Sequence, residues 1–133
     1  EHTNKPEILA LFSISTSPLF YYFCFLIKKI NKFVMVKHIV FWKLKDEAAG
    51  NNKAANAQLI KEKLENLNGK IDGLIKVEVG IDFLGEGNYD VALYSELDTK
   101  EALDTYQNHP LHQAVLPFVR EVVSDRKAID FEI

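Results

Sequence analysis

The sequence predicts a single α+β domain whose elements follow the order β, α, β, β, α, β. Two observations carry this prediction. Strand-like segments recur four times between residues 36 and 133, and two helical patterns separate them. The chain has 133 residues, which is long enough for one ordinary domain and too short for two.

The predicted domain begins with a strand over residues 36–44 (VKHIVFWKL), which is rich in β-branched and aromatic residues. The polar residues 45–58 then form a loop that leads into a helix. This helix extends to about Asn68, because Asn68 and Gly69 together are typical of a helix end. Its apolar side chains recur on one stripe, at Leu59, Ile60, Leu64 and Leu67.

The middle of the domain is predicted to hold two strands. Residues 74–83 alternate between apolar and polar side chains, and residues 89–97 form the next strand. Residues 84–88 (LGEGN) form the turn between them. The alternation places five apolar side chains on one face of the first of these strands: Ile75, Val77, Val79, Ile81 and Phe83.

The last part of the domain is predicted to be a broken helix followed by a strand. Residues 98–101 start a helix that stops at His109, and Pro110 suits the first turn of a further helix with a bend at Pro117. In the strand that ends the chain, Ile129, Phe131 and Ile133 alternate with polar residues and Ala128.

This order predicts the ferredoxin-like arrangement, a four-stranded antiparallel sheet with helices on one face. The first strand is nevertheless apolar on both faces, with Val40 and Trp42 on one and Ile39 and Phe41 on the other. The helices suffice for one face only. Burial of the other against a second copy removes apolar area from water at about 25 cal/mol per Å², so we expect a two-fold homodimer.

Residues 8–27 form an uncharged run that is followed by Lys28, Lys29 and Lys32. Three interpretations are open: translated upstream sequence before a true start at Met35, a membrane anchor, or a soluble extension. We therefore expect residues 1–34 to be an extension and residues 35–133 to be the domain. A membrane partner follows only if the run is an anchor.

Composition narrows the possible partners. Residues 36–133 contain 12 of the 16 Lys and Arg residues and 17 of the 19 Asp and Glu residues, which argues against nucleic acid as a partner. The single cysteine, Cys24, excludes an internal disulfide framework, and no Cys/His spacing indicates zinc. We expect no metal, no cofactor and a cytoplasmic location.

Three stretches together resemble the stress-responsive dimeric α/β-barrel (Dabb) family: residues 36–40 (VKHIV), residues 106–112 (YQNHPLH) and the tail strand that ends in Asp130 and Phe131. The resemblance covers residues 35–133. It implies a dimer in which two sheets face each other and close into a barrel. Most members have no assigned activity, and one plant member is a polyketide cyclase that acts by aldol condensation.

The resemblance to the cyclase also implies a site. Its catalytic histidine falls on His112 and its tyrosine on Tyr106, while two further histidines fall on His38 and His109. One more histidine falls near Asp90, and an acidic side chain would not hold the same keto acid.

A neutral imidazole at His112 can remove a proton next to a carbonyl group, and Tyr106 can hydrogen-bond the resulting enolate. We expect His38, His109 and Trp42 to contact the ligand. A structural alternative stands beside each candidate. His109 suits a helix cap, His112 a bond to a backbone carbonyl, Tyr106 and Trp42 the core, and His38 the core or an interface.

Three functions fit these residues. The first is a homodimer of unassigned activity that holds a small apolar or aromatic ligand in its barrel. The second is a cyclase-like or isomerase-like enzyme with His112 as general base and Tyr106 as its partner. The third is a structural protein whose barrel is filled by Trp42, Val40, Phe83 and Tyr94. We favour the first, with the enzyme as the alternative.

Overall fold

The computed structural model describes residues 17–23 and 34–133. The chain divides into two compact units, Glu1–Phe33 and Val34–Ile133. In the first unit, residues 18–23 are helical. The other residues of the predicted extension, and with them most of the uncharged run at 8–27, lie outside the described residues. Within residues 17–23 and 34–133, no helix has the length and apolar character needed to cross a membrane.

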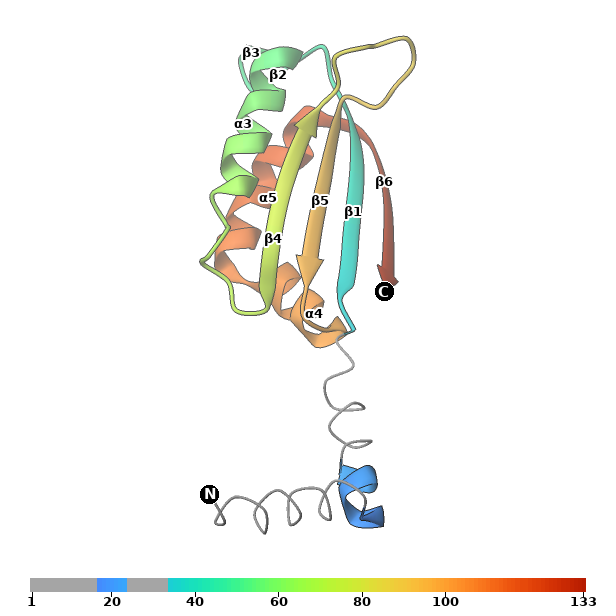
Figure 1. Cartoon of the computed structure of the whole chain (residues 1–133). Coiled ribbons are helices and arrows are strands. Elements are labelled where there is room, and N and C mark those ends of the chain that lie inside the picture. Colours follow the sequence, from blue (N-terminus) through green and yellow to red (C-terminus); the bar gives the residue numbers. More distant parts are fainter. Residues whose placement is uncertain (1–16, 24–33) are drawn as a thin grey trace, which may run out of the picture. The chain divides into compact units, whose positions relative to one another are not determined.

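The second unit is built on a four-stranded antiparallel sheet with the strand order β4-β5-β1-β6 (Figure 1). This order and the alternation of strands and helices confirm the predicted ferredoxin-like fold. The central strand β1 is hydrogen-bonded to β5 on one side and to β6 on the other. The strands are β1 (Val36–Leu44), β4 (Leu74–Ile81), β5 (Val91–Leu97) and β6 (Val123–Glu132).

Three helices cover one face of this sheet: α3 (Lys53–Glu65), α4 (Lys100–Asn108) and α5 (Pro110–Val122) (Figure 1). The predicted loop over residues 45–58 is partly wrong, because it contains a small hairpin, β2 (Glu47–Ala48) and β3 (Asn51–Asn52), and the first turns of α3. Asparagine side chains explain this difference. Asn52 caps α3 by accepting a hydrogen bond from the Ala55 backbone N–H at 2.8 Å, and the buried Asn56 amide donates to the Ala48 carbonyl at 2.9 Å.

The break between α4 and α5 occurs where the sequence predicts it. The Thr99 hydroxyl caps α4 by accepting a hydrogen bond from the Ala102 N–H at 3.0 Å. His109 is in the extended conformation that a residue before proline prefers, and α5 begins at Pro110. Pro117 lies inside α5.

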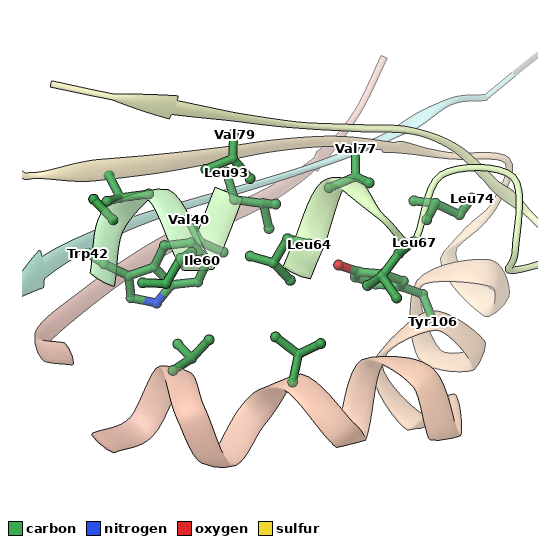
Figure 2. Close-up of a cluster of buried hydrophobic side chains, with 14 of the residues drawn as sticks. Val40, Trp42, Ile60, Leu64, Leu67, Leu74, Val77, Val79, Leu93 and Tyr106 are labelled. Atoms are coloured by element: carbon green, nitrogen blue, oxygen red, sulfur yellow. The ribbon is translucent and has the colours of Figure 1, made fainter. Parts of the chain in front are cut away.

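The core lies between the helices and the sheet (Figure 2). Alternate residues of β1 face the helices and are buried, and β5 supplies Leu93 to the same layer. The alternation expected over residues 74–83 holds for Val77 and Val79, which are buried. It fails for Ile75, because the register of β4 shifts at that residue, and for Phe83, which is 98% exposed beyond the end of the strand.

The opposite face of the sheet, which α3, α4 and α5 leave uncovered, is here called the open face. In β1 it carries Lys37, Ile39, Phe41 and Lys43, because residues of this parity are only partly buried or exposed. The pairing register adds Tyr94 from β5 to this face, opposite Ile39. Val40 and Trp42 lie on the helix side instead, so the idea that both fill the space between two sheets is wrong. Both side chains are buried in the core between the sheet and the helices.

Gly73 fixes how closely the N-terminal part of α4 approaches the sheet. It has a positive φ of 82°, and a Cβ atom at this position would lie 2.7 Å from the Cβ of Ala102. The Gly73 carbonyl also accepts a hydrogen bond from the Asp98 N–H at 2.9 Å. The glycine is therefore required by conformation and by space together.

We expect Gly73→Ala to destabilise the domain more than Gly69→Ala does. Gly69 has a similar positive φ of 77° but open space around its missing Cβ, so its substitution reports conformational strain alone, roughly 1–2 kcal/mol. The overlap with Ala102 should add about 1 kcal/mol or more. Urea unfolding of the two variants measures the difference, and equal losses of stability would contradict the steric argument.

Candidate functional site

A pocket of about 380 Å³ opens between the sheet and helices α4 and α5. We call it the helix-side pocket. His38, Trp42 and His112, three of the five predicted site residues, lie in its lining. The pocket is partly open and lies on the helix side of the sheet, opposite to the open face. It therefore differs in location from the barrel between two facing sheets, where the ligand is expected from the sequence. The remaining lining residues are Val40, Leu64, Leu93, Gln107, Asn108, Gln113, Leu116, Val119, Arg120 and Arg126.

His38 enters the site from the middle of β1. Its side chain is buried, and its Nδ1 is hydrogen-bonded to the carboxylate of Asp130, the residue directly opposite on β6. An ionised carboxylate only accepts hydrogen bonds, so Nδ1 carries the proton. This bond fixes the orientation of the ring and leaves Nε2 for another partner.

Tyr106 packs against the two histidines but, as a fully buried residue, is absent from the pocket lining. Its ring centroid is 4.5 Å from that of His112 and 6.4 Å from that of His38. The residue is fully buried, and its hydroxyl is the one buried side-chain polar atom without a hydrogen-bond partner among the described residues. In Figure 2 the hydroxyl points toward Leu64 within the cluster. Burial raises the pKa of Tyr106 to about 12, so the hydroxyl stays protonated and can donate.

His112 lies in the first turn of α5, and its ring is half-buried. Its Nδ1 lies 3.1 Å from the backbone carbonyl oxygen of Gln107, which can only accept, so Nδ1 donates and Nε2 is the basic nitrogen. Burial lowers the pKa of His112, the bond to Gln107 opposes this, and the neighbouring His38 lowers the pKa further. The imidazole is therefore held neutral near physiological pH.

The structure separates His109 from this group. The His109 ring caps α5 by accepting a hydrogen bond from the Leu111 N–H at 3.1 Å, and His109 is absent from the pocket lining. Trp42, in contrast, is a core residue that also lines the pocket.

Asp90 also lies elsewhere. Its carboxylate accepts a hydrogen bond from the Leu44 N–H at 2.8 Å and belongs to a separate hollow next to the hairpin at residues 82–90. That hollow has a volume of about 560 Å³ and is wide open. It contains no histidine and no unpartnered buried polar group, so it is the weaker candidate.

Among the pocket residues that sequence reasoning missed, two are charged: Arg120 and Arg126. Both are exposed at the rim of the pocket. A signal for Arg120 was available, because residues 112, 116 and 120 follow the i, i+4 spacing of one helix face. No such signal existed for Arg126, whose position depends on the register that pairs it with Trp42.

These features define a class: a ferredoxin-like α+β domain whose own helices cover one sheet face only, with a partly open pocket between the sheet and the helices. Residues 36–133 match the Stress responsive A/B Barrel Domain family, and the chain belongs to this family. No metal-binding cluster of three His, Cys, Asp or Glu side chains occurs within the described parts of the chain.

Solved structures of other proteins share the ferredoxin-like fold of this chain. A dimeric protein of unknown function and ferredoxin-like fold from Bacteroides fragilis is 35% identical, with a TM-score of 0.68 over 74% of this chain and 96% of its own. A dimeric ferredoxin-like protein of unknown function from Thermobifida fusca is 27% identical, with a TM-score of 0.66 over 77% of this chain and 93% of its own. Among proteins with curated descriptions, none matches this sequence.

Protonation of His112 is expected to weaken the fold. Because its folded pKa is lowered, the unfolded chain takes up the proton first as the pH falls. The stabilising contribution is complete above the unfolded value, about 6.5, and is lost as the pH falls through the folded pKa. Between about pH 7.5 and about pH 5 the melting temperature of the parent should therefore fall more steeply than that of His112→Gln. Parallel curves in thermal circular dichroism would contradict this.

Proposed function

We propose that this chain forms a homodimer through its open face and that each subunit binds a small apolar or aromatic ligand in the helix-side pocket. The observation that carries the proposal is the pocket itself. Apolar side chains line it together with a neutral His112, whose ring packs against that of Tyr106, a buried residue behind the lining. The cytoplasmic location stays a prediction.

The dimer rests on the apolar character of the open face. Ile129 and Phe131 of β6 are 54% and 38% exposed, and Phe41 of β1 is 39% exposed. The central charges of this face neutralise each other, because the Lys37 ammonium lies 2.7 Å from a Glu96 carboxylate oxygen. A pair that is already formed can be buried at lower cost than an isolated charge. The dimeric description of the Bacteroides fragilis and Thermobifida fusca proteins supports this assembly.

The ligand site rests on the contrast between the pocket walls and its polar end. Val40, Leu64 and Leu93 supply apolar surface, and Trp42 supplies a flat aromatic wall. A volume of about 380 Å³ is within the range of small-molecule sites. An unpartnered buried hydroxyl costs roughly 1–3 kcal/mol. Tyr106 lies behind the lining, so a ligand carbonyl or hydroxyl group that reached it past the lining residues would recover part of this free energy.

A second function, general-base catalysis, is favoured by one observation. The bond between Nδ1 of His112 and the Gln107 carbonyl leaves Nε2 as a neutral base, and Tyr106 remains a donor within the same group of rings. His112 would take a proton from a carbon next to a carbonyl group, and Tyr106 would stabilise the enolate oxygen. The proton would then return from the imidazolium to the product.

A thermal-shift screen of the full chain against planar aromatic compounds and β-keto acids tests the pocket. We expect a binding compound to raise the melting temperature of the parent and to raise that of His112→Ala less. His109→Asn is the matched control, because asparagine preserves the helix cap and the residue lies outside the pocket lining. It should respond like the parent.

The two functions differ in their response to Tyr106→Phe. A binding protein should lose affinity only. An enzyme should lose turnover of the bound compound by roughly a hundredfold or more, as when one oxyanion donor is removed. Absence of any compound that shifts the parent would count against the pocket as a ligand site.

Ile39→Asp should convert the dimer to a monomer, because it places a charge in the middle of the open face between Tyr94 and Ile129. Leu111→Asp is the control, since Leu111 is 42% exposed on α5, away from the open face. Sedimentation velocity of both variants gives the mass directly. A dimeric Ile39→Asp, or a monomeric parent, would exclude the open face as the interface.

A further inference from the structure

The chain contains two arginines, Arg120 and Arg126, and both line the helix-side pocket. Neither guanidinium group forms an ion pair or a hydrogen bond within residues 17–23 and 34–133. Five lysines of the domain, in contrast, are ion-paired with acidic side chains: Lys37, Lys53, Lys61, Lys76 and Lys100. The two most capable anion-binding side chains are therefore held at one pocket and left unpaired.

The charge around the pocket is opposite to that of the domain. Residues 36–133 carry 17 acidic and 12 basic side chains, yet no aspartate or glutamate lines this pocket. The carboxylate of Asp130, near its inner end, is already bonded to His38. Arg120 has a further structural use as a cation in the last turn of α5. Arg126 has none that the contacts show, and it lies on β6 directly opposite Trp42.

The arginines and the histidines lie at opposite ends of the pocket. His112 and Arg120 are two turns apart on α5, which is about 12 Å along the helix axis. His38 and Trp42, the partner of Arg126, are four residues apart on β1, which is about 13 Å along the strand. The helix and the sheet thus place the two kinds of side chain in the same order along the pocket, with the arginines at one end, His38 and His112 at the other, and apolar side chains between them.

Resting on the function proposed above, we propose that the ligand is an organic acid: a carboxylate bound by Arg120 and Arg126, attached to an apolar body that lies along Trp42, Leu93 and Leu116. A guanidinium group matches a carboxylate with two parallel hydrogen bonds, and neither arginine is engaged in an ion pair that would compete for them. The aliphatic and aromatic side chains of the pocket walls would contact the apolar body of the ligand. The end away from the carboxylate reaches His112.

Calorimetric titration of the full chain with phenylacetate and with its neutral analogue phenylacetamide tests the assignment. We expect the acid to bind about tenfold more tightly than the amide. This is the gain in affinity that one charge-assisted hydrogen-bonded pair provides at the exposed rim of a pocket. Arg120→Gln and Arg126→Gln should each remove most of this preference and leave the amide affinity unchanged. Lys127→Gln is the matched control, because it removes one positive charge next to Arg126 but on the open face, opposite Phe41. It should keep the preference.

Equal affinity for acid and amide, or an acid preference that both arginine variants retain, overturns this inference. If His112→Ala then lowers the affinity for both probes equally, the pocket still binds ligands, and only the inference about the carboxylate is lost. Tighter binding of phenyl phosphate than of phenylacetate overturns the choice of carboxylate as the head group. Binding of neither probe overturns the pocket function and this inference together.

Discussion

The register of β1 in the centre of the sheet is the constraint on which the other features depend. This strand is paired on both edges, with β5 and with β6, and its side chains alternate between two environments. One set meets the helices and forms core and pocket, and the other lies on the open face. A slip by one residue would exchange the two sets and move His38 and Trp42 out of the pocket. Core, pocket and proposed dimer interface therefore share a single structural cause.

The domain separates its two polar systems by the thickness of the sheet. On the open face, Lys37, Tyr94 and Glu96 are bonded to one another and need nothing further. On the helix side, the Tyr106 hydroxyl has no partner and the arginines have no counter-ion. The buried hydroxyl lowers the stability of the empty protein, whereas the exposed guanidinium groups are solvated by water. The arginines are thus available to a ligand, which is why the helix-side pocket carries the functional proposals.

Helix α5 connects the two ends of that pocket. Its first turn presents His112, which the Gln107 carbonyl of α4 orients, and its last turn presents Arg120. The break at His109 and Pro110 makes this possible, because it allows α4 and α5 to take different directions. His109 thus has a defined structural contribution as the cap of α5, although its side chain stays outside the pocket. The helix-cap alternative that the sequence offers for His109 is the one that the structure shows.

The sequence by itself determined the element order, the helix break at Pro110, the apolar character of both sheet faces and the family. Each of these follows from local periodicity or from a short motif, which depend on neighbouring residues only. The tertiary structure decided which face each strand presents to the helices. It placed Trp42 and Val40 beneath the helices, Tyr94 on the open face and Phe83 beyond the sheet, because pairing register is set by contacts between distant segments. It also decided that Arg126 lies opposite Trp42 across a strand pair, although the two residues are far apart in the sequence. A spacing rule along one chain segment cannot express such a contact.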